Sequence, residues 1–301
     1  MNGWKNIKNV GVDMNKKDIL DFNLSHKDLM VNRMKRSNPN FNLDKPKTIQ
    51  EKLCWLNIYD VDAWDDFYNK PLKTICADKL LVKEYAANKV CENIGIPTLK
   101  VYDKVSDIKW DELPNEFVIK CNHGSGMNII CNDKSKFNFK DAENKLTLWM
   151  YDDYTFRHGL ESHYHWIDRK IIVEPLMKNN KSNSLFDYKF WCFNGKPKFY
   201  TINDGNGHGA IIHYDMNKKQ MALERKDYPV PKNLKYEQPK NFDKMVQYAK
   251  KLSEDFKFVR VDFYEINNKV YLGELTFTPG VCNFQYKNQA DNLKVGDLLK
   301  L

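Results

Sequence analysis

The sequence of 301 residues is long enough for one large domain or two to three small ones, and its hydrophobic fraction of 42% is that of a folded soluble protein. No apolar run approaches the roughly 20 residues of a membrane span. The first residues lack a signal-peptide segment, and seven scattered cysteines without a CxxC pair indicate reduced thiols, so we expect a cytoplasmic protein.

The net charge of +8 also limits the class of ligand. A basic protein favours anionic ligands such as nucleotides, uronates or a lipid surface. The lysines are spread along the whole chain, and no Lys/Arg block is dense enough to predict nucleic-acid binding.

The first part of the chain is predicted to be helical. Residues 1–70 are polar, and the segment KTIQEKLCWLNIY begins with a capping box from Thr48 to Glu51. The segment CADKLLVKEYAANKVCENIGIP predicts one further continuous helix with a C-cap at Gly95.

The rest of the chain alternates between strand and helix patterns. Strands are predicted in TLKVYD, FVIKC and NIIC, and residues 138–166 return to a helical pattern. Further strands are predicted in KIIVEPLM, DYKFWCFNGKPKFYTI and IIHYD, followed by a helix over about 241–254 and a hairpin in FVRVDFYEINNKVYLGELTF. This order predicts the α+β class.

A glycine loop connects two of these strands in FVIKCNHGSGMNIIC. Lys120 closes the first strand, and Gly124 and Gly126 would let backbone N–H groups approach an anion. Walker A and Rossmann glycine patterns are both absent from the sequence. Two interpretations stay open here, a plain hairpin turn and a lid over phosphates.

Lys79 is predicted to lie in the first turn of its helix, directly after Asp78. A cation at this position opposes the helix dipole, whereas an anion is favoured there. Lys79 is therefore either an exposed lysine that turns away or a contact for an anion bound at the helix start.

The hairpin near the end of the chain carries two carboxylates. A three-residue turn at 267–269 would place Val261 opposite Leu275 on an apolar face, and Asp262 opposite Glu274 on the other face. Opposed carboxylates repel each other, and a shared Mg²⁺ would relieve the repulsion. Without the metal, neutralising either acid should leave stability unchanged or slightly higher. The alternative is two solvated acids.

A strand end in Glu174-Pro175-Leu176-Met177 is followed by a polar loop and by Asp187-Tyr188-Lys189. The proline frees the backbone from sheet pairing where a flat base could bond to main-chain groups. An ordinary strand end is the alternative. In RHGLESHYHWIDRK, the residues His163 and Tyr164 are candidates either for an acceptor-side role or for simple packing.

Five motifs together carry a family resemblance. They are ADK (77–79), LPNEFVIKCNHGSGMNII (113–130), KIIVEPLM (170–177), DYKFWCFNGKP (187–197) and VRVDFYEINNKVYLGELTFTPG (259–280). In this order they resemble the ATP-grasp superfamily, and more narrowly the TupA-like ATP-grasp proteins of bacterial capsule, O-antigen and teichuronopeptide gene clusters. The resemblance implies an ATP-grasp fold, in which two α+β subdomains (71–169 and 170–301) grip ATP, with a helical N-terminal extension (1–70).

The resemblance also implies roles for individual residues. Lys79 and Lys120 would contact the ATP phosphates, and the flexible lid would comprise Gly124, Ser125, Gly126 and Met127. His123, beside the lid, is a further nucleotide-binding candidate. Glu174, Leu176 and Met177 would flank the adenine, Asp187 would lie near the ribose, and Asp262 and Glu274 would hold Mg²⁺. Arg260, as a clamp on an acyl phosphate, and Lys189 are the candidate catalytic residues. Thr276 stands where many ATP-grasp enzymes have an asparagine, so a third side-chain metal ligand is in doubt.

The activity implied by the resemblance is an ATP- and Mg²⁺-dependent carboxylate–amine ligase that acts through an acyl phosphate. Its expected partners are a carboxylate-bearing sugar or glycan and an amine, with peripheral association with a membrane glycan-assembly complex. Alternatives are a kinase for a sugar or sugar alcohol, a glycosyltransferase, and an ATP-sensing partner of a membrane glycan complex.

Overall fold

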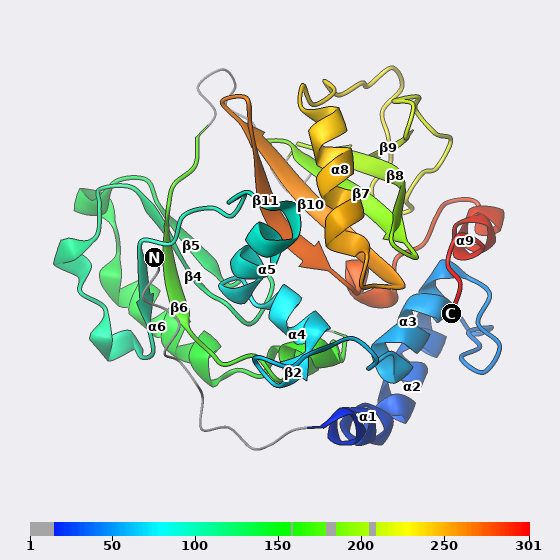
Figure 1. Cartoon of the computed structure of the whole chain (residues 1–301), viewed down its shortest axis with the longest axis horizontal. Helices are drawn as coiled ribbons and strands as arrows, with labels where there is room; N and C mark the ends of the chain where they lie inside the picture. Colours follow the sequence, from blue (N-terminus) through cyan, green and yellow to red (C-terminus); the bar gives the residue numbers. More distant parts are fainter. Residues whose placement is uncertain (1–14, 158, 179–184, 205–208) are drawn as a thin grey trace.

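The computed structural model describes residues 15–157, 159–178, 185–204 and 209–301. Two antiparallel sheets lie side by side, with short helices beside the gap between them (Figure 1). The helices are α1 (Lys16–Ser25), α2 (Lys27–Ser37), α3 (Ile49–Tyr59), α4 (Leu72–Ala77), α5 (Leu81–Val90), α6 (Phe139–Tyr151), α7 (Tyr154–Arg157), α8 (Phe242–Ser253) and α9 (Gln289–Gly296). None of the helices in these ranges is long and apolar enough to cross a bilayer.

The strands fall into three groups. A two-residue hairpin consists of β1 (Trp64–Asp65) and β2 (Lys70–Pro71). The small sheet has the order β3 (Lys100–Tyr102), β6 (Ile171–Pro175), β4 (Phe117–Cys121) and β5 (Asn128–Cys131). The large sheet has the order β11 (Lys269–Thr276), β10 (Phe258–Ile266), β7 (Asp187–Phe193), β8 (Lys196–Asn203) and β9 (Ile212–Asp215). Single 3₁₀ turns include η4 (Ser162–Tyr164) and η5 (Pro279–Cys282).

The large sheet is buried on both faces, which explains the continuous apolar run in β7. Phe190 and Cys192 point into a cluster formed with α4, α5 and α8. Trp191 and Phe193, on the opposite face, pack with residues of α2, α3 and α9. Alternate side chains of a strand point to opposite faces, so a strand covered on both sides needs no polar alternation.

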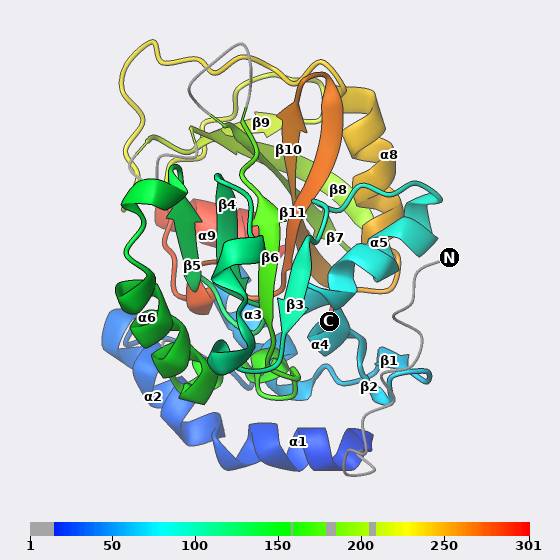
Figure 2. The same ribbon diagram turned by 90° about the vertical axis from the view of Figure 1, so that its left-hand side faces the viewer.

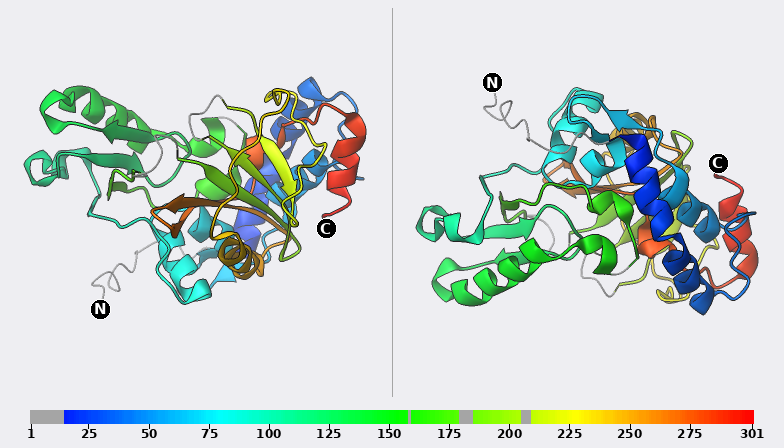
Figure 3. Two further views of the ribbon diagram at one scale, coloured as in Figure 1. Left: turned by 90° about the horizontal axis from the view of Figure 1, so that it is seen from above. Right: turned by 90° about the horizontal axis from the view of Figure 1, so that it is seen from below.

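The small sheet has one apolar face and one polar face. Phe117, Ile119 and Cys121 of β4 are fully buried in a cluster that includes residues of α6. Val118 and Lys120 alternate with them and point to the other face. In the views of Figures 2 and 3, α6 covers this sheet on its outer side. Because β6 pairs with β3 and β4, its sheet partners lie on the other side of the predicted boundary at residue 170.

The N-terminal helices form part of the core. The predicted capping box is present, with Glu51 N–H donating to Thr48 Oγ1 and the Glu51 carboxylate accepting from Thr48 N–H. Met30 and Met34 of α2 are 5% and 1% exposed, and they belong to the cluster that covers the Trp191 face of the large sheet.

The predicted continuous helix over residues 76–95 is interrupted. Helix α4 ends at Ala77 and α5 begins at Leu81, and α5 ends at Val90 with Cys91 in the left-handed region at φ 56°. The prediction of a C-cap at Gly95 is wrong, because Gly95 instead forms a parallel bridge with Leu272 of β11. Lys79 therefore lies in the turn between two helices and not in the first turn of one.

Candidate functional site

The C-terminal hairpin has the predicted pairing but not the predicted turn. Asn267 and Asn268 form a two-residue turn with φ values of 51° and 66°, so the three-residue turn was wrong. Gly273 then supplies an extra residue in a β-bulge, and the bulge shifts the register by one. As a result Asp262 lies opposite Glu274 as predicted.

The two carboxylates are neutralised by cationic side chains. Arg260 donates from Nε to Asp262 Oδ1 at 2.7 Å and from Nη2 to Asp262 Oδ2 at 2.5 Å, and Nη2 also reaches Glu274 Oε1 at 3.1 Å. Lys189 Nζ lies 2.9 Å from Asp262 Oδ2 and 3.3 Å from Asp187 Oδ2. The repulsion that suggested a metal is thus relieved by Arg260 and Lys189, which corrects the argument from repulsion alone.

The ionisation of the hairpin acids follows from this network. Burial opposes ionisation of Glu274, but the charges of Arg260 and Lys189 outweigh it and lower its pKa to about 2. Burial raises the pKa of Asp262, and the same two cations oppose the rise. Glu274 remains 40% exposed, whereas Asp262 is 2% exposed. One carboxylate therefore faces the open side of the site and the other lies beneath it.

The donor set of the hairpin is compatible with a hard divalent ion. Carboxylate oxygens are the ligands that Mg²⁺ prefers, and it usually takes its remaining ligands from water and phosphate. Across the described ranges, no group of three or more His, Cys, Asp or Glu residues is placed to hold a metal. Asp262 and Glu274 could therefore hold such an ion only together with oxygens from a bound ligand or water.

A second charged group lies on the polar face of the small sheet. Glu174 is 3% exposed and forms two ion pairs, one with Lys120 Nζ at 2.6 Å and one, through its other oxygen, with Lys83 Nζ at 2.5 Å. Lys83 also donates to Thr98 Oγ1 at 2.6 Å. The buried carboxylate holds two lysines from different elements, β4 and α5, beside each other.

The interruption between α4 and α5 places Lys79 in the same group. Asp78, buried, accepts from Leu80 N–H at 2.7 Å and from Asn122 Nδ2 at 2.9 Å, which ties the turn to the glycine loop. Lys79 Nζ donates to the Gly124 carbonyl. Burial and the nearby charge of Lys120 lower the pKa of Lys79, while the charge of Glu274 raises it. Lys79 thus lies between the two sheets.

The glycine loop is docked on α7. A Cβ at Gly124 would lie 2.6 Å from the Tyr154 ring, so the loop requires glycine there for close packing, whereas Gly126 requires it for its φ of 72°. Ser125 is exposed at the tip; burial raises the pKa of Tyr154, and hydrogen bonding with Ser125 opposes the rise. This strand–loop–strand geometry is compatible with both interpretations of the loop, a plain hairpin turn and a lid over phosphates.

Two predicted nucleotide-binding residues, one of them in the lid, point away from the site. His123 is 1% exposed, its Nε2 lies 3.0 Å from the Trp149 carbonyl of α6, and burial lowers its pKa to about 4. Met127, also 1% exposed, belongs to the apolar cluster of the small sheet. Their side chains lie on the α6 face, opposite Lys120, which contradicts a direct ligand-contact role for these two side chains.

The predicted adenine and ribose positions are partly described. Leu176 and Met177 follow β6 directly and are half-buried, and residues 179–184 lie outside the described residues. Asp187 opens β7 on the face of Lys189 and accepts from Asn203 Nδ2 at 3.2 Å. These residues lie at the ends of strands that leave the small sheet and enter the large one.

Sequence reasoning missed two residues of this arrangement, Lys83 and Asn122. Lys83 follows Lys79 by four residues, and a shared helical face would have suggested it. Asn122, fully buried, donates to Asp78 and accepts from Lys170 N–H at 2.8 Å. Its position inside the glycine loop was the only signal available.

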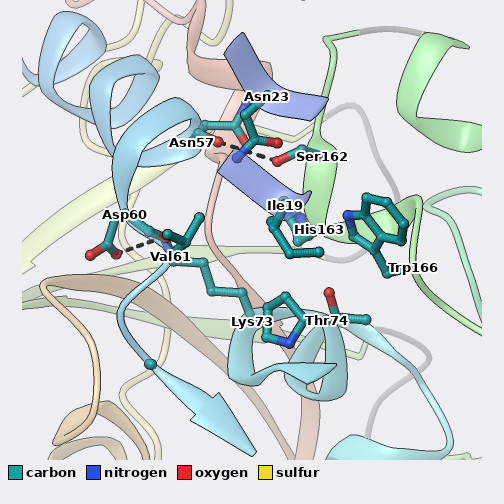
Figure 4. Close-up of a pocket in the computed structure, with 12 residues that line it drawn as sticks. Ile19, Asn23, Asn57, Asp60, Val61, Lys73, Thr74, Ser162, His163 and Trp166 are labelled. Atoms are coloured by element: carbon teal, nitrogen blue, oxygen red, sulfur yellow. Dashed lines mark hydrogen bonds and ion pairs between the residues drawn. The ribbon is translucent and has the colours of Figure 1, made fainter. Parts of the chain in front are cut away.

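A separate cavity behind this region is too small for a substrate. It lies between α1, α3, α4 and η4 and measures about 20 Å³, room for a single water molecule (Figure 4). Asn23 Oδ1, Thr74 Oγ1 and Trp166 Nε1 are buried there without a hydrogen-bond partner among the described residues. These polar atoms and this volume suit one buried water.

Comparison with known proteins supplies the family. A family model for TupA-like ATPgrasp proteins matches residues 51–300, which confirms the resemblance carried by the motifs and the ATP-grasp fold class. No curated protein sequence matches this chain.

Solved structures similar to this chain include those of three ligases. A D-alanine–D-alanine ligase from Bacillus anthracis complexed with ATP has 16% identity over 75% of this chain and 63% of its own, with a TM-score of 0.38. The enzyme of the same name from Helicobacter pylori has 17% identity over 83% and 69%, with a TM-score of 0.42. An L-amino acid ligase from Bacillus licheniformis has 12% identity over 70% and 43%, with a TM-score of 0.41. The chain spans less than two thirds of the first and third of these structures.

Proposed function

We propose that this chain, which belongs to the TupA-like ATP-grasp family, is an ATP- and Mg²⁺-dependent ligase that joins a carboxylate to an amine through an acyl phosphate. Its proposed substrates are a uronic acid or another sugar-linked carboxylate, and an amine, in the assembly of a bacterial surface polysaccharide. The net charge of +8 suits anionic substrates of this kind.

One observation carries this proposal. Lys79, Lys83 and Lys120 lie on the small-sheet side of the gap, near the buried carboxylates of Glu174 and Asp78. Lys83 and Lys120 pair with Glu174, whereas Lys79 forms no ion pair with a described residue and donates to the Gly124 carbonyl. The charge of Lys79 is therefore available for a polyphosphate, and the hairpin carboxylate of Glu274 lies close enough to act on this lysine.

The residues divide into two sets of roles. Lys79 and Lys120 bind phosphate oxygens and neutralise charge that develops during transfer, while Glu174 keeps Lys120 and Lys83 in place. Arg260 and Lys189 bind the anionic group that accepts the phosphoryl. Asp262 and Glu274 would hold Mg²⁺, which supplies additional charge neutralisation when it is bound with the nucleotide.

The chemistry requires positioning and charge neutralisation more than a reactive side chain. A substrate carboxylate oxygen attacks the γ-phosphorus of ATP, and ADP leaves. The amine then attacks the acyl carbon, and the bond from this carbon to the phosphate oxygen breaks. Neither step needs a protein nucleophile, and the guanidinium of Arg260 can hold two anionic oxygens at once.

Product analysis tests the proposal. The purified protein is incubated with ATP, Mg²⁺, an amine and one of three carboxylates, glucuronate, galacturonate or UDP-glucuronate, and ADP and products are followed by mass spectrometry. We expect ADP release that depends on the carboxylate and an amide product. A phosphate ester would identify a kinase instead, and ADP release without an acceptor product would favour an ATP-sensing role.

A further inference from the structure

A buried carboxylate outside the hairpin network lies close to it. Glu161 precedes η4 and is 6% exposed, and Thr278 Oγ1 donates a hydrogen bond to its Oε1. Two residues before Thr278, the hydroxyl of Thr276 donates to Glu274 Oε1 at 2.9 Å. The segment that ends β11 therefore holds Glu274 with one threonine and Glu161 with the next.

Tyr164 lies between the two carboxylates. Burial raises its pKa, the charges of both Glu161 and Glu274 raise it further, and the charge of Arg260 lowers it. Its side chain is partly buried, and its ring packs edge-on against Tyr154 with the ring centroids 4.9 Å apart. Tyr154 also contacts the glycine loop, so Tyr164 lies next to the residue that supports this loop.

The neighbouring histidine does not share this position. His163 is 6% exposed, its ring packs against Phe277 at 5.6 Å, and burial lowers its pKa to about 3. Of the two residues considered for an acceptor-side role, His163 packs in the interior, whereas Tyr164 lies near the charged groups of Glu274 and Arg260.

The backbone around Glu161 is strained. Leu160 has a φ of 56°, and Val281, which lies against Gly159, has a φ of 50°. Such conformations of branched residues are unfavourable and persist only where the surroundings enforce them. Asn57 Nδ2 donates to the Leu160 carbonyl at 2.8 Å, and Arg33 Nη1 donates to the Val281 carbonyl at 3.2 Å.

These contacts come from the N-terminal helices. Asn57 belongs to α3 and Arg33 to α2, and Ser162 Oγ also donates to the Asn57 carbonyl, at 3.2 Å (Figure 4). The backbone on both sides of Glu161 is therefore held by α3, and the Val281 segment by α2, the helices that also cover the large sheet. Strain that is maintained by several separate elements favours a functional role for the residue it positions.

The charges near Glu161 leave it able to exchange a proton. Within the described residues it forms no ion pair, and the groups that act on it are Arg33 from α2, Glu274 from β11 and the Thr278 hydroxyl. Burial raises its pKa to about 7, against the lowering effects of Thr278 and Arg33. A carboxylate of this kind is half-ionised at neutral pH, which is the range in which a general base works best.

We propose that Glu161 and Tyr164 form the amine subsite, in which Glu161 accepts the proton that an ammonium nucleophile must lose before it attacks the acyl phosphate. This inference rests on the proposed ligase function. The amine enters as R–NH₃⁺ and gives one proton to the Glu161 carboxylate, and its lone pair then forms the bond to the acyl carbon. The carbon–oxygen bond to phosphate breaks, phosphate keeps the electron pair, and the second nitrogen proton leaves with it or with water.

A comparison of two nucleophiles tests the subsite. Hydroxylamine is uncharged at neutral pH and needs no base, so it reports acyl phosphate formation as a hydroxamate. Glycine and ammonium must first lose a proton. For Glu161→Gln with the three carboxylates named above, we expect hydroxamate formation within about twofold of wild type and amide formation lower by about 10²-fold or more. The amide rate should recover in part as pH rises toward the pKa of the amine.

Glu51→Gln is the matched control, since Glu51 is 5% exposed and caps α3. The proposal is overturned if Glu161→Gln keeps both rates, or if it loses both rates to the same extent as Glu51→Gln. It is also overturned if the amide rate of Glu161→Gln shows no recovery at high pH.

Failure of the ligase function itself has a separate signature, the absence of hydroxamate with wild type and every carboxylate. In that case, the effect of added amines on the melting temperature tests the subsite. With Mg–ADP present, methylammonium should raise the melting temperature of wild type more than tetramethylammonium does, and Glu161→Gln should lose the difference. Equal effects of the two ions on wild type would overturn the amine subsite.

Discussion

Replacing Asp262 by asparagine is expected to lower the free energy of unfolding by about 3–5 kcal/mol, the usual cost of removing one partner from a buried ion pair. Asp262 is 2% exposed and accepts two bonds from Arg260, at 2.7 and 2.5 Å, and one from Lys189 at 2.9 Å. An asparagine would leave Arg260 with the longer contact to Glu274 at 3.1 Å, and Lys189 with the longer contact to Asp187 at 3.3 Å. Glu274→Gln should cost only about 0–1 kcal/mol, because Glu274 is 40% exposed.

Urea unfolding of the nucleotide-free proteins in the presence of a chelator measures both values. Converted at about 2 °C per kcal/mol, Asp262→Asn should also melt about 6–10 °C below wild type. The sequence alone predicts the opposite sign, since it foresees only repulsion between Asp262 and Glu274. If Asp262→Asn is as stable as wild type, the ion pairs with Arg260 and Lys189 contribute nothing and the network is wrongly interpreted.

Three further predictions follow from the same structure. Lys120→Ala should reduce the rise in melting temperature that Mg–ADP gives to wild type, and an unchanged rise would leave Lys120 only its pairing role. The pKa of Glu161 is raised from 4.5 to about 7, so the folded state binds more protons in that window and stability falls as pH rises through it. Glu161→Gln should remove this fall, seen as a gain relative to wild type in unfolding experiments at pH 8 compared with pH 5. Gly124→Ala should shift the loop off the Tyr154 ring and weaken nucleotide binding in calorimetry, whereas Gly126→Ala, with open space around it, should cost only about 1–2 kcal/mol in stability.

The pairing of the hairpin acids could be predicted because one face of the hairpin must be apolar. A shift by one residue exchanges the two faces of a strand. The apolar side chains therefore determine the register wherever one face must be buried. The turn could not be predicted in the same way. The Asn267–Asn268 turn and the bulge at Gly273 each shift the register by one residue, and the two shifts cancel at Asp262 and Glu274. Because the bulge at Gly273 compensates for the shorter turn, the alternation of apolar residues around Asp262 and Glu274 is the same with or without the two deviations.

The glycine loop and the strands around it were predictable for similar reasons, but the residues that organise the site were not. Asp78 ends α4 by accepting bonds from the next turn and from Asn122, which is distant in sequence. Glu161 acquires its burial from Thr278 and from the strained segment near Val281. Contacts of this range are formed only in the folded chain, and no periodicity of the sequence records them.

The way in which α2 and α3 cover the large sheet has a consequence for any replacement of the leading helices. The shared family pattern begins at residue 51, yet the cluster on the Trp191 face includes Met30, Met34 and Ile49. The segment that matches the family model is therefore smaller than the unit that folds. A chain in which the leading helices were replaced would have to rebuild this cover, together with the contact from Arg33 to the Val281 carbonyl.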